Sequence, residues 1–183
     1  MKRAIRMTRV YPHPPERVWA ALTSAEALAV WLMPNDFVAE LGHRFTFRTE
    51  PAPGFDGIVH CEVLELAAPE RMVWSWRGGP IDTRVSFTLT LEAAPDGRAS
   101  TRLAFAQTGF EGPRAMAVSF ILERGFPKMF GAALPAVLAQ LEAGEPPTAP
   151  PRKPPHPLAA AFERTFAKLI ARREPRDGTG DDA

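Results

Sequence analysis

The stretch GFPKMFGAALPAVLAQL, residues Gly125 to Leu141, decides the fold because it presents one long apolar face late in the chain. Its apolar side chains recur at steps of three and four residues, which predicts an amphipathic helix. They are Phe126, Phe130, Leu134, Val137, Leu138 and Leu141. Such a face is stable only when another surface covers it, so the residues upstream have to supply that surface.

In the upstream residues from His43 to Gln107, apolar side chains recur at every second position and no longer at helical spacing. Apolar and aromatic side chains alternate there with charged and hydroxyl side chains. This pattern is typical of an antiparallel sheet with one face covered and the other face in water. Short turns at residues 68–70, 78–80 and 95–97 predict that consecutive strands pair in order.

The remaining segments predict one more strand and several helices. Residues 4–11 read as a first strand, followed by two short helices. The late amphipathic helix contains two prolines that disturb it. Pro127 disfavours the helical conformation at Phe126, so we expect a break there. Pro135 presses on the preceding turn and predicts a kink near Gly131.

The predicted order of elements is that of the α+β helix-grip fold, in which a curved antiparallel sheet wraps around a long C-terminal helix. The residues also resemble a known family. The resemblance lies in PHPPERVWAALTSAEALAVWLMP (12–34), GIVHCEVLELAAPERMVWSW (57–76) and RVSFTLTLEAAPDGRASTRLAFAQTGF (84–110). These stretches are similar to the Activator of Hsp90 ATPase homologue 1-like branch of the START/polyketide cyclase superfamily. The resemblance implies a deep apolar cavity between sheet and helix, but no single activity, because fold and function separate readily.

The aromatic side chains of the covered face are either a plain core or the lining of a ligand pocket. The resemblance favours a pocket for an apolar or aromatic small molecule. Trp74 and Trp76 favour it too, because a buried indole N–H needs an acceptor. Gln107 falls on the same face and could orient a polar end of the ligand. Arg9 would join this face only if the first strand has no bulge, and we expect it to point to solvent. The predicted ligand-binding residues are Trp31, Phe45, Phe47, Trp74, Trp76, Phe87, Phe105, Gln107, Phe126, Met129 and Phe130.

Catalytic and metal-binding side chains do not converge in the sequence pattern. The four histidines, His13, His43, His60 and His156, fall on different elements. Cys61, the only cysteine, alternates with apolar residues and reads as a small buried group. We therefore predict no catalytic residue, no metal and no cofactor. Two alternatives to non-catalytic ligand binding stay open: a cyclase or dehydratase acting on a polyketide-like substrate, and a chaperone partner or other protein-interaction module.

The composition and the C-terminal residues limit the kinds of partner that we expect. The 183 residues carry a formal net charge of +1, which argues against nucleic-acid binding. No apolar run approaches the ~18 residues of a membrane span, so we expect a cytoplasmic protein without stable membrane association. We divide the chain into a helix-grip domain (1–144), a Pro-rich linker (145–157), an amphipathic helix (158–173) and a disordered tail (174–183). The appended helix could dock on its own domain, form a homodimer or bind a protein partner.

Overall fold

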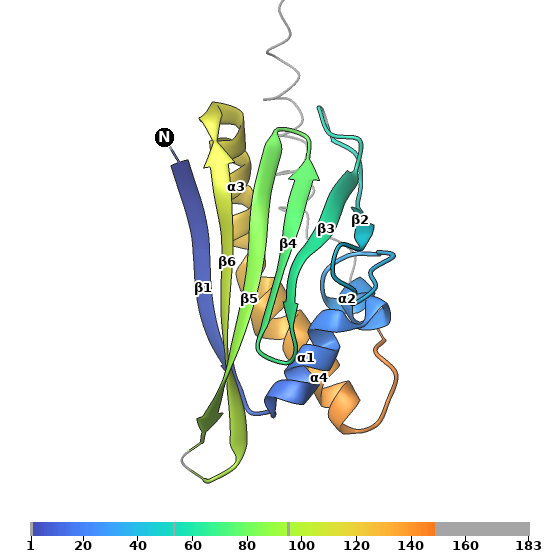
Figure 1. The fold of residues 1–183 in the computed structure, drawn as a ribbon, viewed down its shortest axis with the longest axis vertical. Coiled ribbons are helices and arrows are strands. Elements are labelled where there is room, and N and C mark those ends of the chain that lie inside the picture. Colours follow the sequence, from blue (N-terminus) through green and yellow to red (C-terminus); the bar gives the residue numbers. More distant parts are fainter. Residues whose placement is uncertain (1, 53, 95, 149–183) are drawn as a thin grey trace, which may run out of the picture.

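Six strands form one sheet, and helices cover one of its faces in the computed structural model, which describes residues 2–148 except 53 and 95 (Figure 1). The strands are β1 (Lys2–Tyr11), β2 (Arg44–Arg48), β3 (Ile58–Ala67), β4 (Arg71–Gly78), β5 (Ile81–Ala93) and β6 (Ala99–Glu111). The predicted appended helix and tail, and most of the predicted linker, lie outside the described residues. We call the helix-covered face of the sheet the inner face and the opposite face the outer face.

The strands pair antiparallel in the order β1-β6-β5-β4-β3-β2, so the five strands after the first two helices form a meander, as the turns predicted. The first strand returns to pair with the last one, which leaves β1 and β2 at the two edges of the sheet. Burial alternates along β5 from Ile81 to Leu89, with the odd-numbered side chains inside. This pattern confirms the α+β helix-grip architecture expected from the alternation.

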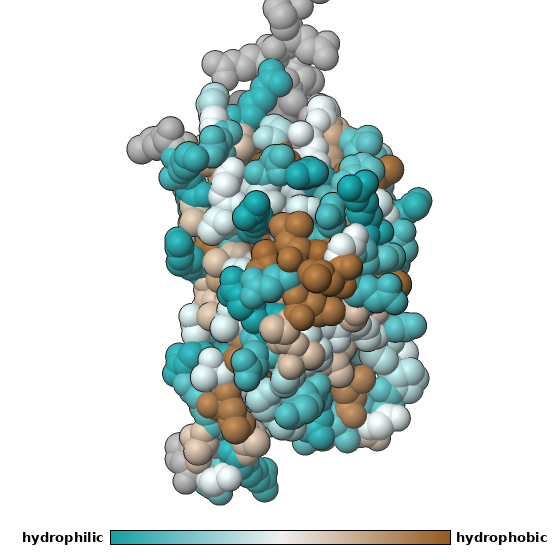
Figure 2. All heavy atoms as spheres, viewed as in Figure 1, coloured by the Kyte–Doolittle hydropathy of each residue, from teal (hydrophilic) through white to brown (hydrophobic). Residues whose placement is uncertain are grey.

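The outer face is largely hydrophilic, with an apolar patch near its middle (Figure 2). Leu64 contributes to the exposed apolar surface because the register of β3 shifts between Val63 and Glu65 and leaves Leu64 39% exposed. Leu41, in the adjoining loop, is also exposed. Gly42, the residue after it, donates its backbone N–H to the carbonyl oxygen of Val63 at 2.8 Å. A β-bulge therefore interrupts the polar surface that strict alternation predicts.

The helices are α1 (Pro15–Thr23), α2 (Ala25–Trp31), α3 (Gly112–Lys128), the π-helical turn η1 (Met129–Ala133) and α4 (Leu134–Glu142). The predicted break at Phe126 is wrong, because α3 continues through this residue to Lys128. Phe126 is only 7% exposed and packs edge-on against Phe105 with ring centroids 4.8 Å apart. This packing outweighs the local preference that Pro127 imposes on the residue before it.

The kink predicted near Gly131 corresponds to the π-helical turn, and Figure 1 shows the chain changing direction between α3 and α4. The backbone N–H of Leu134 donates to the carbonyl of Met129, five residues earlier. Pro135 has no N–H to continue this pattern, so the carbonyl of Phe130 lacks a helical donor. The hydroxyl of Tyr11 donates to this carbonyl at 2.7 Å and satisfies it.

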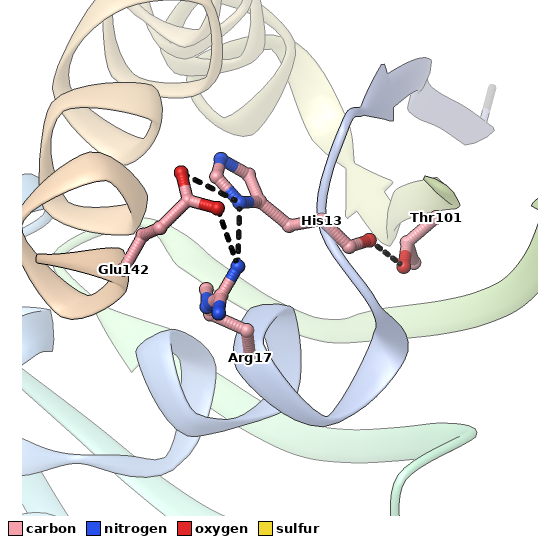
Figure 3. A network of polar contacts seen from close by, with 4 residues as sticks. All are labelled: His13, Arg17, Thr101 and Glu142. Atoms are coloured by element: carbon pink, nitrogen blue, oxygen red, sulfur yellow. Dashed lines mark hydrogen bonds and ion pairs between the residues drawn. The ribbon is translucent and has the colours of Figure 1, made fainter. Parts of the chain in front are cut away.

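A polar network links the end of α4 to α1 and, through His13, to β6 (Figure 3). Arg17 of α1 donates to Glu142 of α4 at 3.1 Å and to Nδ1 of His13 at 3.2 Å. The carbonyl of His13 accepts a hydrogen bond from Thr101 of β6 at 2.7 Å. Burial lowers the pKa of His13, although Glu142 opposes this effect. The network thus fixes α4 beside α1 and β6.

Candidate ligand-binding site

The aromatic side chains of the inner face form a continuous set of contacts centred on Trp74 of β4. The Trp74 ring meets Phe45 at 5.4 Å, Phe47 at 5.8 Å and Phe87 at 5.0 Å between centroids, all in edge-on geometry. Its side chain has no exposed surface. Edge-on contacts of this kind stabilise the packed state beyond the burial of area.

The helical segment joins this set through Phe130 in η1. The Phe130 ring lies 5.4 Å from Trp31 of α2 and 5.0 Å from Phe105 of β6 between centroids. It also contacts Phe87 and Phe126, at 6.5 Å and 5.9 Å. Phe130 is therefore the ring through which η1, α2 and the sheet meet.

The predicted ligand-binding residues are all buried except Met129, which is partly buried against the same core. The structure brings most of them together, but Trp76 lies at one end of the set. Its ring lies 5.3 Å from Phe47 between centroids in a tilted geometry, towards the β4–β5 turn. Their use in ligand binding stays a prediction.

Trp74 carries an unsatisfied hydrogen-bond donor. Its indole Nε1 is buried and is the one buried side-chain nitrogen or oxygen without a hydrogen-bond partner among the described residues. The indole of Trp31, by contrast, donates to the carbonyl of Ala21 at 2.9 Å. A buried donor without an acceptor costs about 1–3 kcal/mol and is rare in folded proteins.

Gln107 points into the interior, as its place in the alternation predicted, and is 2% exposed. Its Nε2 donates to the hydroxyl of Thr83 at 3.0 Å, and that hydroxyl donates to the carbonyl of Trp76 at 3.2 Å. Thr83 was missed by the sequence interpretation, although the alternation of β5 places it on the inner face.

Arg9 is placed differently from our expectation. The register of β1 with β6 shifts between Arg3 and Ala4, upstream of Arg9, where Gly109 of β6 is the extra residue, and every later residue of β1 pairs one to one with β6. Arg9 therefore stands opposite Leu103 on the inner face. A Cβ at Gly131 of η1 would lie 3.8 Å from a terminal nitrogen of the Arg9 guanidinium. The face that Arg9 occupies therefore differs from our expectation, but its side chain is exposed to solvent, as expected.

Two further aromatic residues of this region were missed. Phe37, in the loop before β2, is 4% exposed and lies 5.0 Å from Phe45 and 5.7 Å from Trp74 between ring centroids. No periodic pattern marks it. Tyr11, which holds the carbonyl of Phe130, follows Ile5 at even spacing and could have been assigned to the inner face by alternation.

A groove of about 360 Å³ lies on the side of the outer face formed by β2, β3 and β4. Most of its charged side chains already have a partner within the protein. Asp36 accepts from the backbone N–H of Thr46 at 2.6 Å, which lowers the pKa of this carboxyl group, and Glu62 pairs with Arg44 at 3.2 Å. Its lining consists of Asp36, Arg44, Phe45, Thr46, His60, Cys61, Glu62, Ser75 and Arg77.

Cys61 and the histidines give no reactive or metal-binding centre in the part of the chain that the structure describes. Cys61 is buried, and this burial raises the pKa of its thiol, which disfavours the nucleophilic thiolate. Within residues 2–148, omitting 53 and 95, no three His, Cys, Asp or Glu side chains are grouped as a metal site requires. No helix within the same described ranges is long and apolar enough to cross a membrane.

Comparison with known proteins places the chain among structures of the same fold. MLL2253 from Mesorhizobium loti is 31% identical with a TM-score of 0.64, over 75% of this chain and 98% of that one. BH1534 from Bacillus halodurans is 26% identical with a TM-score of 0.56, over 70% of this chain and 91% of that one. CalU16 from Micromonospora echinospora is 17% identical with a TM-score of 0.57, over 93% and 89% of the two chains, and supports the fold alone.

Comparison with curated proteins gives no match. The family model described as Activator of Hsp90 ATPase homolog 1-like protein matches residues 12–139, which include both short helices, the strands from β2 to β6 and most of the helical segment. Because this match spans well over half of the sequence, the chain belongs to the Activator of Hsp90 ATPase homolog 1-like family.

Proposed function

We propose that the protein binds an apolar or aromatic small molecule between the inner face of the sheet and the α3–η1–α4 segment. The observation that carries this proposal is the buried indole N–H of Trp74, which has no acceptor among the residues that the structure describes. A carbonyl or hydroxyl oxygen of a ligand would satisfy it, and the surrounding rings of Phe45, Phe47 and Phe87 would contact the apolar body of the ligand.

The ligand gains access in this proposal by a shift of η1. Phe130 fills the space between α2 and the sheet, so its ring has to move before a ligand can take its place. The backbone around it is suited to such a change, because η1 has π-helical bonding and Pro135 supplies no N–H to the turn. Single π-helical turns inside α-helices are frequently found at functional sites.

The polar side chains of the inner face favour binding over catalysis. Besides Tyr11, whose hydroxyl donates to the carbonyl of Phe130, the buried ones in the described part of the chain are Thr83, Thr101 and Gln107. None of the three side chains ionises near neutral pH, and each is already hydrogen-bonded within the protein. A cyclase or dehydratase needs groups that transfer or stabilise protons at the substrate. The interaction-module hypothesis rests on residues 158–173, which lie outside the described residues.

The test uses two ligands of similar shape, 2-acetylnaphthalene and 2-isopropylnaphthalene, of which only the ketone accepts a hydrogen bond. Equilibrium dialysis gives the affinity of each for the full chain. Because one hydrogen bond contributes about 1 kcal/mol, Trp74→Phe is expected to lower the ketone-to-hydrocarbon affinity ratio about fivefold. The phenylalanine side chain is smaller than that of tryptophan, and this change affects the affinities of both ligands. Their ratio cancels this effect.

Trp76→Phe is the matched control, since it removes an indole from the same strand and should leave the ratio unchanged. An unchanged ratio in Trp74→Phe would overturn the role of Trp74. Failure of both naphthalenes to bind the wild-type chain would overturn the proposed function itself.

A further inference from the structure

An arginine side chain lies at the border between solvent and the aromatic interior, where β1 passes η1. Arg9 is on the inner face opposite Leu103, and its guanidinium lies near Gly131, where an added Cβ would be 3.8 Å from one of its terminal nitrogens. It also lies close enough to Tyr11 to lower the pKa of that hydroxyl, against the larger effect of burial, which raises it. The positive charge therefore stands beside the turn that carries Phe130.

Among residues 2–148, omitting 53 and 95, no group accepts a hydrogen bond from this guanidinium. Other arginines that reach a helix are paired. Arg3 lies 2.5 Å from a carboxylate oxygen of Glu123 on α3, and Arg17 lies 3.1 Å from one of Glu142 on α4. Within the described ranges, Arg9 has no ion pair and no side-chain hydrogen bond of this kind. A planar cation with five N–H donors is thus available to a carboxylate or sulfonate.

Apolar side chains lie between Arg9 and the aromatic interior. Met7, two residues before it on the same face, pairs with Phe105, whose ring contacts Phe126 and Phe130. Met7 and Met129 are partly buried against the core. Methionine side chains are flexible and adapt readily to a new apolar neighbour.

We infer that Arg9 selects ligands with an anionic end, so that the ligand class is an aromatic or aliphatic carboxylate or sulfonate. This inference rests on the proposed function: the apolar body lies under η1, and the anionic group remains at the β1 edge on the guanidinium of Arg9. Gly131 assists because it has no side chain between the turn and Arg9.

The test compares two fluorescent probes that share one aromatic framework. 8-Anilinonaphthalene-1-sulfonate carries a sulfonate, and N-phenyl-1-naphthylamine does not. Arg9→Gln should weaken the affinity of the full chain for the sulfonate probe about tenfold, since hydrogen bonds to charged groups are the stronger ones, and leave the neutral probe unaffected. Arg9→Lys, which keeps the charge, should recover part of the loss.

Arg6→Gln is the matched control, because Arg6 is exposed on the outer face of the same strand and its substitution changes the net charge equally. Equal weakening by Arg6→Gln and Arg9→Gln would show only a general effect of charge and would overturn the inference. Equal effects of Arg9→Gln on both probes would also overturn it. Failure of the neutral probe to bind the wild-type chain, with Arg9-dependent sulfonate binding kept, would instead contradict the proposed apolar site and leave Arg9 as an anion site.

Discussion

The hydroxyl of Tyr11 donates a hydrogen bond of 2.7 Å to the backbone carbonyl of Phe130, 119 residues later in the chain. This bond compensates for a donor that the helix lacks, because Pro135 has no N–H to offer. The edge strand β1 thereby holds the π-helical turn that carries the central aromatic ring. The same strand places Arg9 beside that turn.

Tyr11→Phe is expected to destabilise the protein by about 1–3 kcal/mol, because it leaves the buried carbonyl of Phe130 without a partner. Urea unfolding measures this loss. Pro135→Ala restores a backbone N–H to the turn, so the cost of Tyr11→Phe should be smaller in that background. An identical cost in both backgrounds would contradict the link between Tyr11 and Pro135.

Phe130→Ala is expected to cost about 3–5 kcal/mol, because it removes a buried ring that contacts four other aromatic side chains. It should also raise the affinity for N-phenyl-1-naphthylamine, since the space under η1 becomes free. Probe fluorescence and urea unfolding give the two quantities. The control is Phe120→Ala on α3, where the ring is 52% exposed, with an expected cost below about 1 kcal/mol. A Phe130→Ala protein that folds and shows unchanged probe affinity would contradict the placement of the ligand.

His13→Gln is expected to flatten the pH dependence of stability on the acidic side. Burial lowers the pKa of His13 in the folded state, so the unfolded chain binds its proton more readily. The folded state therefore loses stability as the pH falls through the ordinary value of 6.5, and the loss is complete below the lowered pKa of the folded protein. The two groups facing the imidazole are Arg17 and Glu142.

The measurement is the urea midpoint of wild type and His13→Gln between neutral pH and the acidic limit of reversible folding. His60→Gln on the outer face of β3 serves as the control and should keep the slope of the wild type. A His13→Gln protein that loses stability with falling pH as steeply as the wild type would contradict the role assigned to this imidazole.

The sheet and the set of aromatic residues could be predicted because two-residue alternation determines which side chains share a face. Gln107 was placed correctly for this reason, and Thr83 and Tyr11 follow the same pattern. The face of Arg9 was not assigned correctly, because it depends on the register of β1 with β6. The register shift between Arg3 and Ala4 comes from an extra residue on β6, Gly109, whose φ is +102°. A glycine inside a strand is the sequence signal that could have located this bulge.

The helical segment shows where local preferences lose to packing. Pro127 predicted a break at Phe126, but the contact of Phe126 with Phe105 keeps α3 continuous. Pro135 did predict the irregular turn, yet its partner on β1 is a long-range contact that no local pattern contains. Phe37 was missed because a loop residue has no period to place it.

The most direct test follows the four tryptophan indole N–H signals of the ¹⁵N-labelled protein by NMR while 2-acetylnaphthalene is added. The Trp74 indole proton should move downfield as it gains an acceptor, and the Trp31 signal, whose N–H already donates to Ala21, should change little. A Trp74 indole signal that stays in place while the ketone binds at saturating concentration would contradict the proposed site.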